Sequence, residues 1–69
     1  MDIKELEYYK TIVECGSILK ASKELNIAQP PLSRMIKNLE SELNTKLFER
    51  GKTLTLLPSG KILYEKAIG

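Results

Sequence analysis

Apolar residues in the first part of the chain recur every three or four positions, as they do along one face of an α-helix. The first series covers residues 3–14 and consists of Ile3, Leu6, Tyr9 and Val13. A second, shorter series consists of Ile18, Ala21, Ser22 and Leu25. Gly16 is a typical residue for a helix end, and Ser17 is a typical N-cap. We therefore expect one helix over residues 3–14 and another that starts at Ile18 and ends at Asn26.

A third apolar series predicts a helix over residues 29–43. It consists of Leu32, Ile36, Leu39 and Leu43. The helix would begin at Gln29-Pro30-Pro31, where proline is tolerated because the first N–H groups of a helix have no partner within it. At about 100° per residue, the positions opposite the apolar series are Pro30, Arg34, Lys37 and Ser41. With Ile27 filling the turn, residues 18–37 would form a helix-turn-helix.

Two short segments after the third helix predict a β-hairpin. Residues 46–50 and 53–57 have strand-like alternation, and Gly51-Lys52 between them suits a two-residue type II′ turn. The inward-facing residues would be Leu47, Phe48, Leu54 and Leu56. A hairpin after a helix-turn-helix is a wing, with Lys52 at its tip within reach of a minor groove or a phosphate. Alternatively, the hairpin only closes the core.

The last segment predicts a fourth helix that starts at Pro58-Ser59-Gly60, with Ser59 as a cap. Its apolar residues are Ile62, Leu63, Tyr64, Ala67 and Ile68, and they serve either the core or a partner helix. The element order predicts a mainly α, winged helix-turn-helix fold with a three-helix core, a two-stranded β-hairpin wing and the start of a C-terminal linker helix. Residues 1–58 would form this domain, with the wing at about 46–57, and residues 59–69 would begin a linker or dimerisation helix. Because the chain stops at Gly69 without a globular continuation, we expect a piece of a longer protein.

Composition favours a binding module over an enzyme. The 69 residues allow one small domain, and they include no histidine and one cysteine, so no nucleophile–base pair or metal cluster is visible and no cofactor is expected. Cys15 has no partner for an intrachain disulfide and is expected to be a small buried thiol. No apolar run is long enough to span a membrane, and no signal peptide follows Met1. The expected compartment is the cytoplasm.

Charge is distributed in blocks along the chain. The net charge of +2 divides into −2 for residues 1–16, +3 for residues 17–37, −2 for residues 38–45 and +3 for residues 46–69. The positive blocks coincide with the helix-turn-helix and the wing, as a polyanionic partner would require. An ordinary solvated surface explains the same pattern, so charge alone leaves both interpretations open.

The residues resemble the N-terminal DNA-binding domain of LysR-type transcriptional regulators over essentially the whole chain. The matching positions are Leu6-Glu7-Tyr8, Gly16-Ser17, Ala21-Ser22, Leu25, Gln29-Pro30, Leu32-Ser33-Arg34, Ile36, Leu39-Glu40, Leu43, Leu47-Phe48-Glu49-Arg50 and Leu56 to Gly60. The resemblance implies a bacterial homodimer or homotetramer that binds a dyad-related site on double-stranded DNA. A C-terminal domain that binds a small-molecule effector normally follows in the family and is absent from this chain.

The resemblance and the side-chain chemistry together define the expected contacts. Helix 29–43 would enter the major groove, and the wing would lie on the backbone or in the minor groove. The expected DNA-binding residues are Ser17, Gln29, Pro30, Pro31, Ser33, Arg34, Lys37, Arg50 and Lys52. The expected dimerisation residues are Ile62, Leu63, Tyr64 and Ala67. Because the pairing helix is short here, we expect this chain to be a monomer or a weak dimer.

The chain departs from the family pattern at three places. Ala28 stands where the family commonly has serine or threonine, so a cap and a phosphate contact are expected to be missing at the start of the third helix. Threonine is usual at the position of Leu57, so the last helix is expected to begin less firmly. The wing between Arg50 and Leu54 is shorter and less basic than usual, which predicts weaker anchoring. Two other functions remain open from the residues alone: a winged-helix protein-interaction module and a small RNA- or single-strand-binding module. The second is disfavoured because the aromatic residues fit core positions better than a stacking platform.

Overall fold

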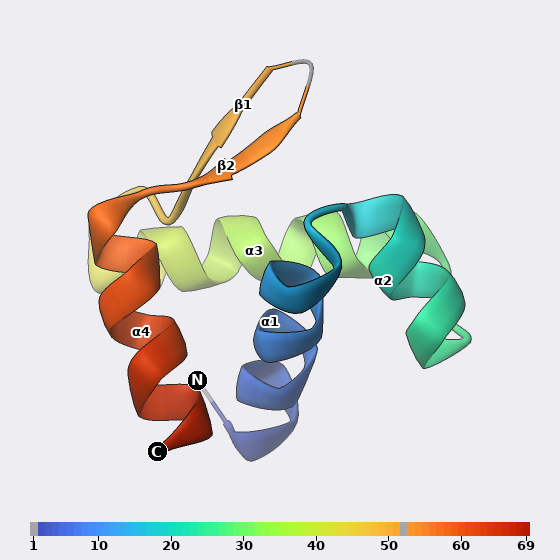
Figure 1. Ribbon diagram of the computed structural model, residues 1–69, viewed down its shortest axis with the longest axis horizontal. Helices are drawn as coiled ribbons and strands as arrows, with labels where there is room; N and C mark the ends of the chain where they lie inside the picture. Colours follow the sequence, from blue (N-terminus) through green and yellow to red (C-terminus); the bar gives the residue numbers. More distant parts are fainter. Residues whose placement is uncertain (1, 52) are drawn as a thin grey trace.

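The computed structural model describes residues 2–51 and 53–69 (Figure 1). The elements in these residues are α1 (Ile3–Cys15), α2 (Ile18–Leu25), α3 (Gln29–Leu43), β1 (Phe48–Arg50), β2 (Leu54–Leu56) and α4 (Pro58–Ile68). Figure 1 shows α2 near one end of α3 and α4 near the other, with α1 between them and the hairpin projecting beyond α3. The predicted mainly α, winged helix-turn-helix fold is confirmed.

The ends of the first two helices follow from local sequence. Asp2 and Glu5 form a capping box at the start of α1, in which each carboxylate accepts a hydrogen bond from the other residue's backbone N–H, at 2.8 and 3.1 Å. The predicted N-cap Ser17 is confirmed, because its hydroxyl oxygen accepts a backbone hydrogen bond at 3.3 Å. Gly16 ends α1 with a φ of 69°, and Asn26 ends α2 with a φ of 57°.

The apolar sides of the helices and the base of the hairpin share one core. Its buried residues are Tyr9, Ile12, Ala21, Leu32, Met35, Ile36, Leu39, Leu47, Phe48 and Leu63. The predicted apolar series of α3 is confirmed at its first three positions and wrong at Leu43, which is 38% exposed. Leu43 is the last residue of α3 and lines a surface hollow instead of the core. Cys15 packs against the core but is only half-buried, so the predicted burial of its thiol is incomplete.

The hairpin has a different register from the predicted one. Its antiparallel pairs are Phe48 with Leu56, Glu49 with Thr55, and Arg50 with Leu54. The strands are shorter than the predicted spans, and residues 51–53 separate the paired ends, so the predicted two-residue loop is wrong. A two-residue loop would have placed Phe48 opposite the polar Thr55. The observed register places Phe48 opposite Leu56, which keeps the apolar side chains on one side of the hairpin. Lys52, the predicted tip residue, lies outside the described residues.

Two helices begin without a side-chain cap, and the sequence predicted this for α3. Neither Ala28 before α3 nor Leu57 before α4 makes a side-chain cap hydrogen bond. The prediction of Ser59 as a cap is wrong, because α4 already begins at Pro58 and Ser59 lies inside its first turn. The Ser59 hydroxyl donates to the backbone carbonyl of Lys46, so it joins α4 to the chain that enters the hairpin.

The first turns of α4 pack closely against the rest of the domain. The Tyr9 hydroxyl of α1 donates to the carbonyl of Gly60 at 2.7 Å. A Cβ atom at Gly60 would lie 2.5 Å from both the carbonyl oxygen of Leu47 and Cδ1 of Leu56, so only glycine fits this approach. The division into a DNA-binding domain of residues 1–58 and the start of a linker or dimerisation helix at residues 59–69 stays a prediction. Among the described residues, no helix has the length and apolar character needed to cross a membrane.

Candidate nucleic-acid interface

The outer side of α3 carries polar and cationic side chains. The positions predicted to face away from the core, Pro30, Arg34, Lys37 and Ser41, are all exposed. Gln29, the first residue of the helix, is exposed as well. The opposite side of α3 is buried in the core, so the domain holds this polar side in a fixed orientation.

The start of α3 is shaped by its two prolines. Pro30 and Pro31 have no N–H, so two of the groups that a cap would satisfy are absent, and the helix begins after Ala28 without one. Pro31 is exposed but lies toward α1, where it lines a hollow of about 140 Å³ with Tyr8. Ser33 is half-buried. The predicted contact residues at this end of α3 therefore do not all share one side of the helix.

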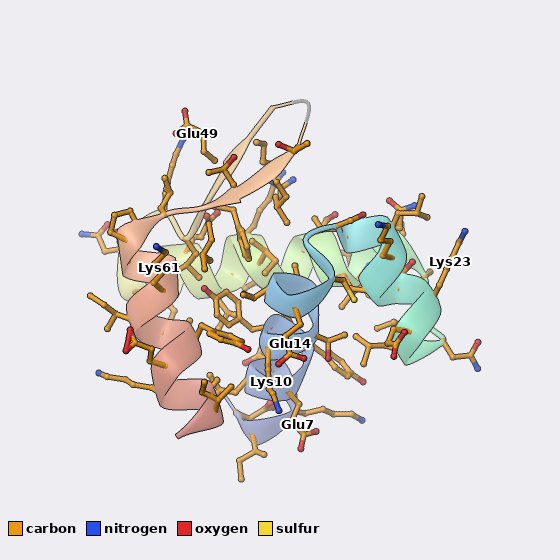
Figure 2. All side chains as sticks on the ribbon, in the orientation of Figure 1. Glu7, Lys10, Glu14, Lys23, Glu49 and Lys61 are labelled. Carbon is orange, nitrogen blue, oxygen red and sulfur yellow. The ribbon has the colours of Figure 1, made fainter. Side chains whose placement is uncertain are left out.

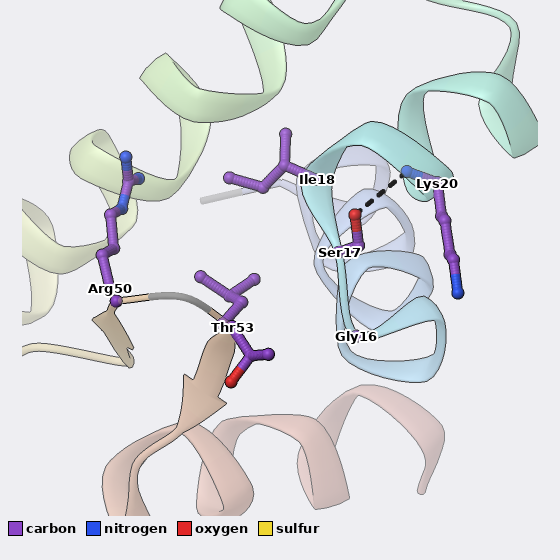
Figure 3. A pocket seen from close by; sticks show the side chains of 8 residues that line it. Gly16, Ser17, Ile18, Lys20, Arg50 and Thr53 are labelled. Atoms are coloured by element: carbon purple, nitrogen blue, oxygen red, sulfur yellow. Dashed lines mark hydrogen bonds between the residues drawn. The ribbon is translucent and has the colours of Figure 1, made fainter.

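A cleft lies between the N-terminus of α2 and the wing. It has a volume of about 400 Å³, and its lining includes Ser17 and Lys20 of α2 and Arg50 and Thr53 of the wing. Figure 3 shows Ser17 and Ile18 on one side of it, with Arg50 extending from the opposite side toward α3. The structure thus brings the predicted contacts Ser17 and Arg50 together around one opening, where a helix N-terminus and a guanidinium both favour an anion.

A second cleft separates α3 from the wing. Its volume is about 560 Å³, and three cations line it together with two carboxylates: Lys37, Lys46, Arg50, Glu40 and Glu49. Arg50 of the wing lines both clefts. Lys37 and Arg50, which the sequence assigned to different elements, therefore line the same cleft.

The residues predicted for dimerisation are placed differently from one another. Ile62 is 59% exposed and lines a hollow with Leu43 on the outside of α4. Leu63 is buried in the core of its own domain. Tyr64 and Ala67 are half-buried, and the Tyr64 hydroxyl donates to the Glu14 carboxylate at 2.8 Å. Of this set, Ile62 has the greatest area available to another chain.

Long-range hydrogen bonds around the site were absent from the sequence prediction. One carboxylate oxygen of Glu40 accepts from the backbone N–H groups of Leu47 at 2.8 Å and Phe48 at 3.3 Å. The sequence analysis gave Glu40 no contact, although this residue lies in an acidic block and at a position that matches the family. Because Leu47 follows the end of α3 closely, a carboxylate one turn before that end is the signal that indicates such a contact.

Two tyrosines are held in their protonated form. Burial, followed by the negative charge of Glu40, raises the pKa of Tyr9 from 10.0 to about 12. The hydrogen bond to Glu14, followed by burial and the charge of the same carboxylate, raises the pKa of Tyr64. Both hydroxyls donate at neutral pH and bond α4 to α1, and the raised pKa values extend this donor state to more alkaline pH. Within residues 2–51 and 53–69, no group of three or more His, Cys, Asp or Glu side chains is placed to hold a metal ion.

Comparison with solved structures gives the same fold bound to DNA. The chain is similar to the DNA-binding domain of BenM in a complex with catB site 1 DNA, with a TM-score of 0.93 and 46% identity, over 99% of this chain and 77% of that one. It is also similar to the CbnR DNA-binding domain in a DNA complex, with a TM-score of 0.93 and 32% identity, over 99% of this chain and 79% of that one.

Comparison by sequence assigns the family. The chain is 46% identical over 69 residues to the regulator BenM of Acinetobacter baylyi, and 44% identical over 66 residues to the regulator YtlI of Bacillus subtilis. These matches cover 99% and 96% of this chain but only 23% and 21% of the relatives, so the chain spans less than a quarter of their length. Residues 3–61 match the family model described as bacterial regulatory helix-turn-helix protein, lysR family. The chain therefore belongs to the lysR family of bacterial regulatory helix-turn-helix proteins.

Proposed function

We propose that this chain binds double-stranded DNA sequence-specifically, with α3 in the major groove and the wing on the backbone or in the minor groove. The observation that carries the proposal is the exposed polar side of α3, held by the core and continuous with the cationic clefts at α2 and the wing. The BenM and CbnR domains, which share the fold, were solved as DNA complexes. Neither relative supports a protein-interaction module as the alternative.

The side chains of α3 divide between base edges and phosphates. The Gln29 amide offers the donor and acceptor that adenine N7 and N6 require, and Pro30 suits a thymine methyl group. Arg34 is assigned to guanine or a phosphate. Ser33, its neighbour in the N-terminal half of α3, is assigned to the major groove as well. Lys37 is assigned to a phosphate, because its compact ammonium acts as a point charge and lacks the planar, fixed donor pair of a guanidinium.

Backbone contacts are assigned to the elements on either side of α3. The Ser17 end of α2 presents N–H groups at a helix N-terminus, which suits a phosphate. Arg50, which lines both clefts, is assigned to the backbone or the minor groove, and so is the tip residue Lys52. Pro31 lies toward α1 and is assigned a role in shaping the helix start.

The proposal for the intact protein follows from the family. We infer a cytoplasmic transcription regulator without enzymatic activity that binds a dyad-related site as a homodimer or homotetramer. A small-molecule effector would act through residues beyond this chain, which spans less than a quarter of its relatives. Ile62 and Ala67 on α4 are the assigned dimer contacts. The 69-residue chain by itself is expected to be a monomer or a weak dimer.

Fluorescence anisotropy across a salt titration tests DNA binding. The domain would be titrated into a labelled random duplex and an equal-length single strand. Tighter binding to the duplex, with the logarithm of the association constant falling linearly with the logarithm of salt concentration, is the expected result, and the slope counts the phosphates neutralised. Equal affinity for the duplex and the single strand, or no duplex binding at low salt, would contradict the proposal.

A further inference from the structure

The carboxylate of Glu40 joins α3 to the chain that enters the wing. Glu40 is half-buried near the C-terminal end of α3, and one of its oxygens accepts from the N–H groups of Leu47 and Phe48 at 2.8 and 3.3 Å. Hydrogen bonds to an ionised acceptor are about twice as strong as neutral ones. Two such bonds accepted by one carboxylate fix the start of β1 relative to α3.

Other contacts at the same place hold the wing to different elements. The N–H of Leu57 donates to the carbonyl of Leu47 at 2.9 Å, and the Ser59 hydroxyl donates to the carbonyl of Lys46. The Phe48 ring packs on the Tyr9 ring with their centroids 5.6 Å apart. These contacts join the start of the hairpin to its return strand, α4 and α1. The Glu40 contact differs from them because it starts on the helix proposed to read DNA.

The position of Arg50 depends on this attachment. Arg50 lies two residues after Phe48 in the same strand, so both side chains lie on the same side of the hairpin. Arg50 also lines the cleft that contains Glu40 and Lys37. A wing that turned away from α3 would carry Arg50 away from Lys37, and the two cations would no longer match phosphates of one duplex.

We propose that Glu40 is the positioning residue that sets the wing on α3 and thereby holds Arg50 at the DNA backbone. This inference rests on the proposed DNA-binding function. It predicts that removal of the Glu40 carboxylate changes the affinity for duplex in the opposite direction to that expected from charge alone. Removal of a carboxylate near a polyanion strengthens binding if charge alone matters, whereas loss of the wing attachment weakens it.

The first test compares two variants that lose the same charge. Glu40→Ala removes the contact, and Glu7→Ala removes an exposed carboxylate from α1 (Figure 2). Duplex binding is measured by anisotropy across salt, at a temperature where each variant is folded by circular dichroism. We expect Glu40→Ala to bind roughly three- to tenfold more weakly, with a salt slope lower by about one, and Glu40→Gln, which keeps an acceptor oxygen, to fall in between. Glu7→Ala should bind at least as tightly as the parent. Unchanged or tighter binding by Glu40→Ala would overturn the proposal.

A double-mutant cycle with Arg50 separates positioning from a general loss of structure. If Glu40 acts through Arg50, Glu40→Ala should cause little further loss of affinity in an Arg50→Ala background. An equal loss in both backgrounds would contradict the proposal, because Glu40 would then act independently of the wing cation.

Amide hydrogen exchange tests the attachment without DNA. In Glu40→Ala, the amides of Leu47 and Phe48 should exchange at least roughly tenfold faster than in the parent, while those of Ile36 and Leu39 keep their protection. Unchanged exchange at Leu47 and Phe48 would overturn the positioning role. If the parent fails to bind duplex, the proposed function fails separately, and exchange still decides whether Glu40 holds the wing.

Discussion

At the scale of single residues, the two exposed cations of α3 have different chemistry although they lie one turn apart. Arg34 has a planar guanidinium whose donors match two acceptors on one guanine edge. Lys37 has a compact ammonium that interacts with a phosphate without reading the sequence. Because both side chains extend from the same rigid helix, their substitution compares these two chemistries in one framework.

Arg34→Ala is expected to weaken specific binding by roughly 1–3 kcal/mol and to relax discrimination at one base pair. Lys37→Ala should weaken binding to all duplexes alike and lower the salt slope by about one. Anisotropy competition with a set of single-base-pair variants of a bound site measures both effects. Unaltered affinity and base preference in Arg34→Ala would remove this residue from base readout.

Gly60→Ala is expected to destabilise the domain by roughly 1–3 kcal/mol, because the new Cβ would lie 2.5 Å from a backbone carbonyl oxygen and from the Leu56 side chain. Gly51→Ala is the matched control, since a Cβ there meets nothing within 4 Å and its cost should stay within about 0.5 kcal/mol. Chemical denaturation measures both values. Equal stability of the two variants would mean that α4 packs less closely than the structure shows.

At the scale of elements, local signals predicted the helices and long-range contacts decided the rest. The helical faces and the Gly16-Ser17 junction follow from residues that are neighbours in sequence, so they could be predicted. The hairpin register could not be predicted in the same way, because it depends on the pairing of Phe48 with Leu56 on the neighbouring strand. The errors at Leu43 and Ser59 have a related cause: their surroundings are set by where α4 packs.

The exposed side of α3 was the most predictable part of the candidate site, since helical spacing alone separates it from the core. The Glu40 contact and the joint lining of two clefts by Arg50 required the folded arrangement of α2, α3 and the wing. The sequence therefore predicts readily which side chains face outward. It predicts less readily which side chains from different elements lie close together.

Because Tyr9 bonds α1 to α4, the free energy of unfolding is expected to fall at alkaline pH. In the unfolded chain Tyr9 ionises near its ordinary pKa of 10.0, whereas in the folded domain the pKa is about 12. The resulting stability is present below pH 10 and is lost as pH rises toward 12, by roughly 2–3 kcal/mol. Denaturant unfolding of the parent and of Tyr9→Phe at several pH values measures this loss. Their difference in free energy of unfolding should narrow above pH 10, and a constant difference would contradict the assignment.

At the scale of the whole molecule, the surface proposed to bind DNA is separate from the rest of the domain's exterior. The outer side of α3, the N-terminus of α2 and the wing form the cationic clefts, while Glu7, Lys10 and Glu14 lie along an outer side of α1 (Figure 2). The core and the two tyrosine hydrogen bonds hold these parts in one body. A duplex that binds as proposed would therefore touch one surface and leave the other unchanged.

Amide chemical-shift mapping of the domain with a short duplex tests this claim most directly. The largest changes are expected at residues 17–20, 29, 32–37 and near Arg50, with little change at Glu7 and Lys10. Changes concentrated on α1, with α3 unaffected, would contradict the assignment of α3 as the DNA-reading helix.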